Sequence, residues 1–159
     1  MALYLFLPAR VRPPFQTVVF FPSARMVGIP NSEKLGDMQC IDYIIQCGRA
    51  VLYPVYKGLY ERSTGALPGP DTAAGRDLML QDAKDLSRSV DYLETRSDLD
   101  RTRIAYVGVS MGAALGVNFT AVDGRFKAVI MLDGGFYNEK PFPGEQVAAQ
   151  RTSDNSWCR

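Results

Sequence analysis

Histidine is absent from the 159 residues of the chain, which holds 18 Lys and Arg against 17 Asp and Glu. An imidazole is the side chain that most often acts as a general base near neutral pH. Any nucleophile in this chain therefore lacks its usual activating group. The near balance of charge, a formal +1, gives no indication of binding to nucleic acid or anionic membranes, so we expect neither as a partner.

Cysteine is scarce, with three residues in the chain. Cys40 and Cys47 are seven positions apart on a predicted helix, which separates them by roughly 10 Å along its axis and excludes a disulfide. We therefore expect buried free thiols. A zinc site built from Cys40, Cys47 and Cys158 would lack both an imidazole and a short ligand spacing, so we expect no metal and no cofactor.

Long apolar runs are missing as well. The N-terminal run "ALYLFLP" is too short for a signal peptide or a membrane span and has no basic segment before it, which predicts a cytoplasmic protein. Neither a phosphate-binding G-x-x-x-x-G-K-[ST] motif nor a dinucleotide-binding G-x-G-x-x-G motif occurs, so no nucleotide cofactor is expected.

Short apolar runs alternate with helical periods along most of the chain. Strands are predicted at 17–22, 50–56, 103–110 and 127–132, and helices at 37–48, around 79–93 and at 111–122. Residues 61–75 are rich in Gly and Pro and predict a surface loop. The alternation is typical of an α/β protein, whose mostly parallel strands are joined by helices that cover both faces of the sheet.

The helix around 79–93 has the clearest periodicity in the chain. Its apolar residues step by four and three: Met79, Ala83, Leu86, Val90 and Leu93. The pattern predicts that this stripe packs on the sheet and that the charged residues face solvent, namely Asp82, Lys84, Asp85 and Arg88. We accordingly interpret Asp82 and Asp85 as part of a solvated helix face and not as an acid/base pair.

The stretch "YVGVSMGAALG" at 106–116 contains the pattern G-x-S-x-G at residues 108–112, between a predicted strand and a predicted helix. A serine on so sharp a turn takes a strained backbone conformation. Residues two before and two after it crowd the turn unless they lack a Cβ, as Gly108 and Gly112 do. The pattern predicts that Ser110 is a nucleophile and that the Met111 N–H stabilises an oxyanion. A second oxyanion donor is expected after the strand at 17–22, from the N–H of Ala24 or Ser23.

The order of these segments resembles the central part of an α/β-hydrolase. More narrowly, "PVYKGLYER" and "RIAYVGVSMGAALG" are similar to the dienelactone-hydrolase and prolyl-oligopeptidase-like branch, including hydrolase domains attached to bacterial serine/threonine protein kinases. The resemblance covers about residues 3–140. It implies a sheet of about five strands, a Ser110 nucleophile, and cleavage of an ester, lactone or peptide-like acyl bond in a small-molecule substrate.

The chain departs from this family where the acid and the histidine are expected, since both follow later strands. We therefore expect a truncated hydrolase core at 1–137 with an irregular tail at 138–159, and an apolar sheet edge at 127–132 that promotes self-association. Asp133 is interpreted as a turn residue. Lys57 and Lys140 are assigned no catalytic role, because a lysine base requires burial.

Two functional hypotheses follow from the sequence. The first is a serine hydrolase whose acid and base lie outside this chain, and which alone has little or no activity. The second is a non-catalytic remnant or binding module that keeps the fold without the chemistry.

Overall fold

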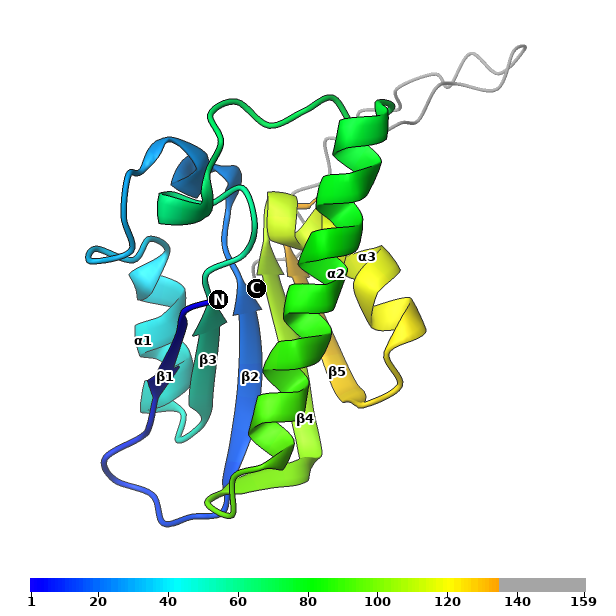
Figure 1. Cartoon of the computed structure of the whole chain (residues 1–159). Coiled ribbons are helices and arrows are strands. Elements are labelled where there is room, and N and C mark those ends of the chain that lie inside the picture. The colour runs from blue at the N-terminus through cyan, green and yellow to red at the C-terminus, as the bar shows by residue number, and fades with distance from the viewer. Residues whose placement is uncertain (135–159) are drawn as a thin grey trace, which may run out of the picture.

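A computed structural model describes residues 1–134, which form one five-stranded sheet flanked by helices (Figure 1). The strands are β1 (Leu3–Phe6), β2 (Phe15–Phe21), β3 (Ala50–Pro54), β4 (Leu99–Val109) and β5 (Phe126–Leu132). Their order in the sheet is β1-β3-β2-β4-β5, with β1 antiparallel to β3 and all other pairs parallel. The predicted fold class is confirmed, and the expected tail at 138–159 lies outside the described residues.

Helices cover both faces of the sheet. In Figure 1, α2 (Ala73–Glu94) and α3 (Met111–Val122) lie in front of the strands and α1 (Met38–Gln46) lies behind them. Two short 3-10 helices, η1 (Ala24–Gly28) and η2 (Tyr60–Arg62), follow β2 and β3. Within residues 1–134, no helix is both long and apolar enough to cross a membrane.

The core lies between the central strands and the helices, and it is unusually rich in tyrosine. Four tyrosines are almost completely buried: Tyr53, Tyr56, Tyr60 and Tyr106. Their hydroxyl groups have partners, as buried polar groups require. The hydroxyls of Tyr53 and Tyr60 share a hydrogen bond of 2.7 Å, and the Tyr106 hydroxyl donates to the carbonyl of Gly112 at 2.6 Å.

Most predicted boundaries are confirmed, and two are shifted. Gly48 ends α1 with a φ of 80°, and β3 ends at Pro54, as expected. Helix α2 begins inside the expected loop 61–75, because the Thr72 hydroxyl accepts a hydrogen bond from the Gly75 amide at 3.0 Å and caps the helix. Strand β4 begins at Leu99, four residues before its predicted start.

Two predictions about individual side chains are wrong. Asp82 does not face solvent: it is only 3% exposed, and Asp85 on the next turn is half-buried. The exposed positions of Lys84 and Arg88 are confirmed. The thiol of Cys47 is exposed because it follows the last turn of α1, and that of Cys40 is half-buried, so neither is a fully buried thiol.

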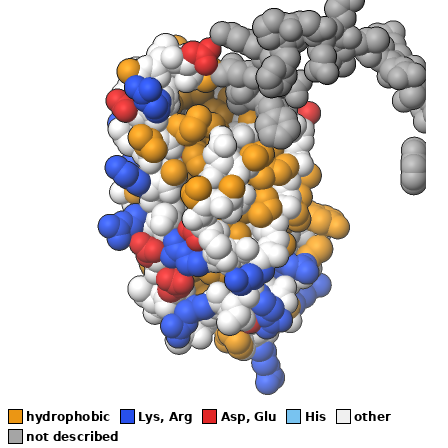
Figure 2. All heavy atoms as spheres, turned by 90° about the vertical axis from the view of Figure 1, so that its right-hand side faces the viewer, with side chains coloured by type: hydrophobic (Ala, Val, Ile, Leu, Met, Phe, Trp, Pro, Cys, Tyr) orange, Lys and Arg blue, Asp and Glu red, His pale blue; other side chains and the backbone are white. Residues whose placement is uncertain are grey.

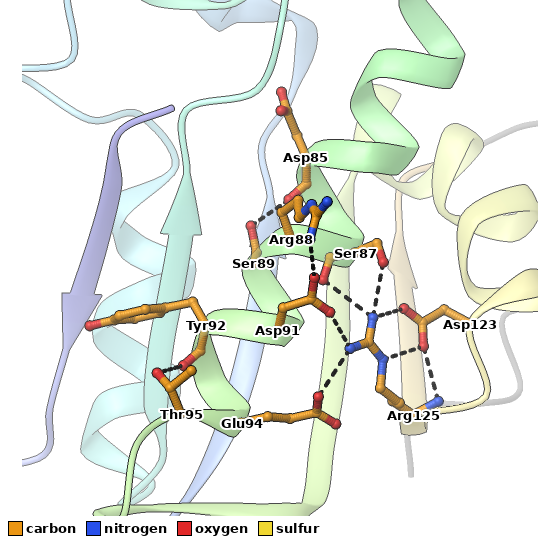
Figure 3. Close-up of polar contacts among 10 residues, drawn as sticks. All are labelled: Asp85, Ser87, Arg88, Ser89, Asp91, Tyr92, Glu94, Thr95, Asp123 and Arg125. Carbon is orange, nitrogen blue, oxygen red and sulfur yellow. Dashed lines mark hydrogen bonds and ion pairs between the residues drawn. The ribbon is translucent and has the colours of Figure 1, made fainter.

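Arg125 links α2 to the turn between α3 and β5 (Figure 3). Its guanidinium group donates to the carboxylates of Asp123 at 2.7 Å and Asp91 at 2.7 Å, and to the carbonyl of Ser87 at 3.2 Å. These bonds lower the pKa of the Asp123 and Asp91 carboxyl groups. A charged group with several partners of this kind fixes the orientation of the two helices.

Strand β5 is an edge of the sheet and is exposed along most of its length. Figure 2 shows hydrophobic side chains gathered on this side of the molecule. The exposed apolar residues of the strand are Val129, Ile130, Met131 and Leu132, each between 36% and 49% exposed. Within residues 1–134, these side chains form the apolar edge predicted at 127–132.

Candidate active site

The carboxyl ends of β2, β3, β4 and β5 meet at one edge of the sheet, at the top of Figure 1. In open α/β sheets, ligands bind in the crevice outside this edge. The residues that follow the four strand ends include Ala24, Lys57, Ser110 and Asp133. The topology thus places the candidate nucleophile and the loop of the candidate oxyanion donor at the same end of the sheet.

Ser110 lies on an abrupt turn between β4 and α3. Its φ of 51° and ψ of −106° are strained for a residue with a side chain. Its amide donates to the Leu132 carbonyl of β5 at 2.8 Å, and its carbonyl accepts from the Ala114 amide at 3.0 Å. The side chain does not cap α3, and no residue within 1–134 forms a hydrogen bond with the half-buried hydroxyl. A ligand would thus displace no hydrogen bond of this hydroxyl to the described residues.

Two glycines make this turn possible. A Cβ on Gly108 would collide with the backbone of Gly112, and a Cβ on Gly112 would collide with the carbonyl of Phe21 at the end of β2. The close approach of the turn to β2 brings Ser110 toward the segment that follows that strand. The spacing of glycines in G-x-S-x-G is thus required by backbone contacts, as the sequence predicts.

The two candidate oxyanion donors open helical segments. Met111 is the first residue of α3 and Ala24 the first of η1, so neither amide has an acceptor within its own helix. The alternative donor, the Ser23 amide, already donates to Asp37 Oδ2 at 2.7 Å. Of the two amides expected in the loop after β2, only that of Ala24 stays a candidate.

A cavity of about 270 Å³ opens beside the turn. It is bounded by the segment after β3, the loop before α2, and the facing turns of α2 and α3. Its lining includes Lys57, Leu67, Pro68, Pro70, Leu78, Met79, Asp82, Met111 and Leu115. The lining is apolar apart from Lys57 and Asp82, which is typical of a pocket that binds an organic ligand through a few polar groups.

Asp82 is the site residue that the sequence analysis missed. Its Oδ1 atom is buried and has no hydrogen-bond partner among the described residues. Burial, together with the negative charge of Asp85, raises its pKa from 3.8 to about 8, so the side chain is mainly a neutral carboxylic acid at pH 7. Positions 82, 86, 89 and 93 step by four, three and four and are all buried, so Asp82 lies on the buried face of α2, although its residue type gave no sign of this in the sequence.

Asp85 has the opposite environment. Its Oδ2 forms an ion pair with Arg62 and accepts a hydrogen bond from the Lys57 amide at 3.1 Å. Of these two carboxyl groups one turn apart on α2, that of Asp85 is thus paired with a cation, whereas the Oδ1 atom of Asp82 has no hydrogen-bond partner among the described residues.

No acid/base partner for Ser110 emerges from the expected alternatives. Asp133 is exposed, with a φ of 54° that suits a turn, as interpreted from the sequence. Lys57 is not confined to polar surroundings, since it lines the apolar cavity, while Lys140 lies outside the described residues. Within residues 1–134, no group of three or more Cys, Asp or Glu side chains is arranged to hold a metal ion.

No model of a protein family matches the chain, and no curated protein matches its sequence. Solved structures do match it. A glucuronoyl esterase from Solibacter usitatus is 22% identical with a TM-score of 0.55, over 84% of this chain and 43% of the esterase. A protein from Butyrivibrio proteoclasticus with ferulic acid bound is 17% identical with a TM-score of 0.62, over 84% of this chain and 48% of that one.

A protein described as a dienelactone hydrolase from Klebsiella pneumoniae is 18% identical with a TM-score of 0.62, over 87% of this chain and 56% of that protein. The predicted resemblance is confirmed at the level of the fold, which is a partial α/β-hydrolase fold. The chain spans about half the length of these structures.

Proposed function

We propose that the chain carries the nucleophile of a serine hydrolase that acts on an ester, lactone or related acyl bond. The observation that carries the proposal is the backbone of Ser110, held at φ 51° and ψ −106° between a parallel strand and the start of a helix. The likeness to an esterase and to a protein with an aromatic acid bound favours an ester over a peptide.

In the proposed reaction, Ser110 Oγ attacks the carbonyl carbon of the ester, and the hydroxyl proton passes to a base. A C–O bond to the serine forms while the carbonyl electrons move onto oxygen, where the amides of Met111 and Ala24 stabilise the negative charge. Collapse of this intermediate breaks the bond to the leaving alcohol, which takes a proton, and water then releases the acid by the same steps.

The base is the part of the reaction that these 159 residues do not supply, because the chain contains no histidine. When such a nucleophile lacks its base, the oxyanion donors and substrate binding alone still accelerate the reaction roughly 10³- to 10⁴-fold over the uncatalysed reaction in water. The chain by itself is therefore expected to turn over activated esters barely detectably. A cytoplasmic location stays a prediction.

The second candidate is a non-catalytic binding module with the same fold. The absence of histidine favours it, since an unactivated serine hydroxyl is a poor nucleophile. In that case the cavity beside Met111 would bind a ligand that is not cleaved.

A fluorophosphonate probe separates the two candidates. We expect slow labelling of the chain, loss of labelling in Ser110→Ala, and unchanged labelling in Ser97→Ala, which alters an exposed serine near the end of α2. Mass spectrometry of the labelled peptide identifies the modified residue. If Ser110 is not labelled above the level of Ser97, the catalytic proposal is wrong and the binding module is favoured.

A further inference from the structure

We propose that the cavity between α2 and α3 binds the apolar side group of the substrate, and that Asp82 donates a hydrogen bond to an uncharged acceptor oxygen on that group. The ligand class is an aromatic or medium-length chain that carries an ether, ester or ketone oxygen. This inference rests on the proposed function, because it places the substrate beside Ser110. The experiment that tests it measures ligand binding and does not depend on catalysis.

The position of the cavity connects it to the candidate nucleophile. Met111, whose amide is a candidate oxyanion donor, directly follows Ser110 and also lines the cavity. A substrate whose carbonyl lies at Ser110 would thus extend its side group past Met111 toward α2. Leu115, one turn further along α3, continues the apolar wall.

The size of the cavity defines the group that it would accept. A protein cavity of about 150 Å³ lined by apolar side chains binds benzene, and this one measures about 270 Å³. It would therefore hold a ring with a short substituent or a chain of comparable bulk. Leu67, Leu78 and Met79 supply further apolar contacts from the loop before α2 and from α2 itself.

Asp82 gives the cavity its polar selectivity. A buried oxygen without a partner is unfavourable unless a ligand or water completes its hydrogen bonding. In its neutral form the group offers one O–H donor. A ligand carboxylate would bring a second negative charge near Asp85, whereas an uncharged oxygen accepts the proton without an added charge.

The charged and titratable groups around Asp82 are few. Asp85 lies on the same helix, Arg62 on η2, Lys57 and Tyr56 in the segment after β3, and Tyr106 on β4. Burial raises the pKa of both tyrosines above the ordinary value. Between neutral and moderately alkaline pH, Asp82, whose pKa is about 8, thus loses its proton while the two tyrosines keep theirs.

A matched pair of ligands tests the proposal: 3-(4-methoxyphenyl)propanamide and 3-(4-ethylphenyl)propanamide, which differ by an ether oxygen in place of a methylene. Binding is followed by NMR of methionine methyl groups in the Ser110→Ala variant, so that no chemistry intervenes. The signals of Met79 and Met111 should shift on titration, while that of Met26, which contacts Gly36 elsewhere, should not.

We expect the methoxy ligand to bind about fivefold more tightly at about pH 6, the effect of one hydrogen bond. Asp82→Leu should remove this preference, and Asp82→Asn, whose amide still donates, should keep it. At about pH 9.5 the preference should disappear in the parent but persist in Asp82→Asn, because the carboxylate has no proton to donate. The exposed Asp42→Asn variant on α1 should behave as the parent.

Two results would overturn the inference: no shift at Met79 and Met111, or an equal preference for the methoxy ligand in Asp82→Leu. Neither depends on the reactivity of Ser110. Failure of the proposed hydrolase activity would instead appear as absent probe labelling with the binding results unchanged.

Discussion

Ser110 occupies a backbone conformation that glycine adopts with less strain. The left-handed φ of 51° is unfavourable for a residue with a Cβ, by about 1–3 kcal/mol in such regions. We expect Ser110→Gly to raise the free energy of unfolding by about 1 kcal/mol, after the larger entropy of glycine in the unfolded chain is subtracted. Urea denaturation followed by circular dichroism measures the change.

The matched control is Ser97→Gly, an exposed position without a left-handed φ. It should lower stability slightly, because glycine gains only unfolded-state entropy there. Equal effects at the two positions would mean that the turn at Ser110 stores no strain.

Asp82 makes stability depend on pH in a defined direction. The folded state holds the Asp82 proton more tightly than the unfolded chain does, since the pKa rises from 3.8 to about 8. The contribution to stability is therefore fully present below about pH 4 and is lost as the pH rises toward 8 and above, by an amount on the order of a few kcal/mol.

In Asp82→Asn this dependence should be absent, because the amide does not titrate. Unfolding free energies measured at about pH 5, 7 and 9 should decline by several kcal/mol less in Asp82→Asn than in the parent, on the order of the shift in pKa, and the control Asp42→Asn should follow the parent. Parallel profiles in the parent and in Asp82→Asn would show that Asp82 is already ionised in the folded state.

The contrast between Ser110 and Asp82 shows what residue patterns can predict. The turn at Ser110 is a local property of two glycines and a serine, so the motif alone predicts its geometry. The environment of Asp82 depends on the depth at which α2 sits on the sheet, which the apolar stripe does not define to within one residue. A carboxyl group at the border of that stripe can be solvated or buried.

Helix α3 approaches β4 closely because Gly116 has no side chain. A Cβ there would collide with the ring of Tyr106. We expect Gly116→Ala to destabilise the protein by about 1–3 kcal/mol, although alanine is the better helix former. Thermal unfolding of the variant measures the effect.

Gly124→Ala provides the control, because a Cβ at that position meets nothing within 4 Å. Its melting temperature should match that of the parent closely. A neutral Gly116→Ala would show that α3 can move away from Tyr106 at little cost.

At the scale of elements, the sequence predicts whether a segment forms a helix or a strand better than it predicts the residues at which that element begins and ends. Helix α1 and strand β3 end where Gly48 and Pro54 require it, since these residues act on the backbone directly. The sequence does not predict the start of α2, because its capping residue Thr72 lies in a run rich in Gly and Pro that is typical of a loop.

For the whole molecule, the open edge of β5 predicts association. Within residues 1–134, β5 pairs with β4 alone, and a free strand edge with exposed apolar side chains offers both hydrogen bonds and apolar surface to a second chain. We expect the chain to elute as dimers or larger species in size-exclusion chromatography, and Ile130→Lys to shift it toward the monomer. A monomeric parent would contradict the expectation.

Leu80→Lys is the matched control, since Leu80 is 55% exposed on α2, compared with 49% for Ile130. It removes a similar apolar side chain from a helix and not from the strand edge. Monomer formation by both variants would point to general solubility and not to pairing along β5.

Ionisation of the four buried tyrosines can be followed by near-ultraviolet absorbance, which makes them a spectroscopic probe of unfolding. Burial raises the pKa of each phenol above its ordinary value of 10, so these protons are held until the structure opens. In rising alkali the near-ultraviolet signal of phenolate from the core should appear together with the loss of helix, as a single cooperative step, and not as a gradual titration beforehand.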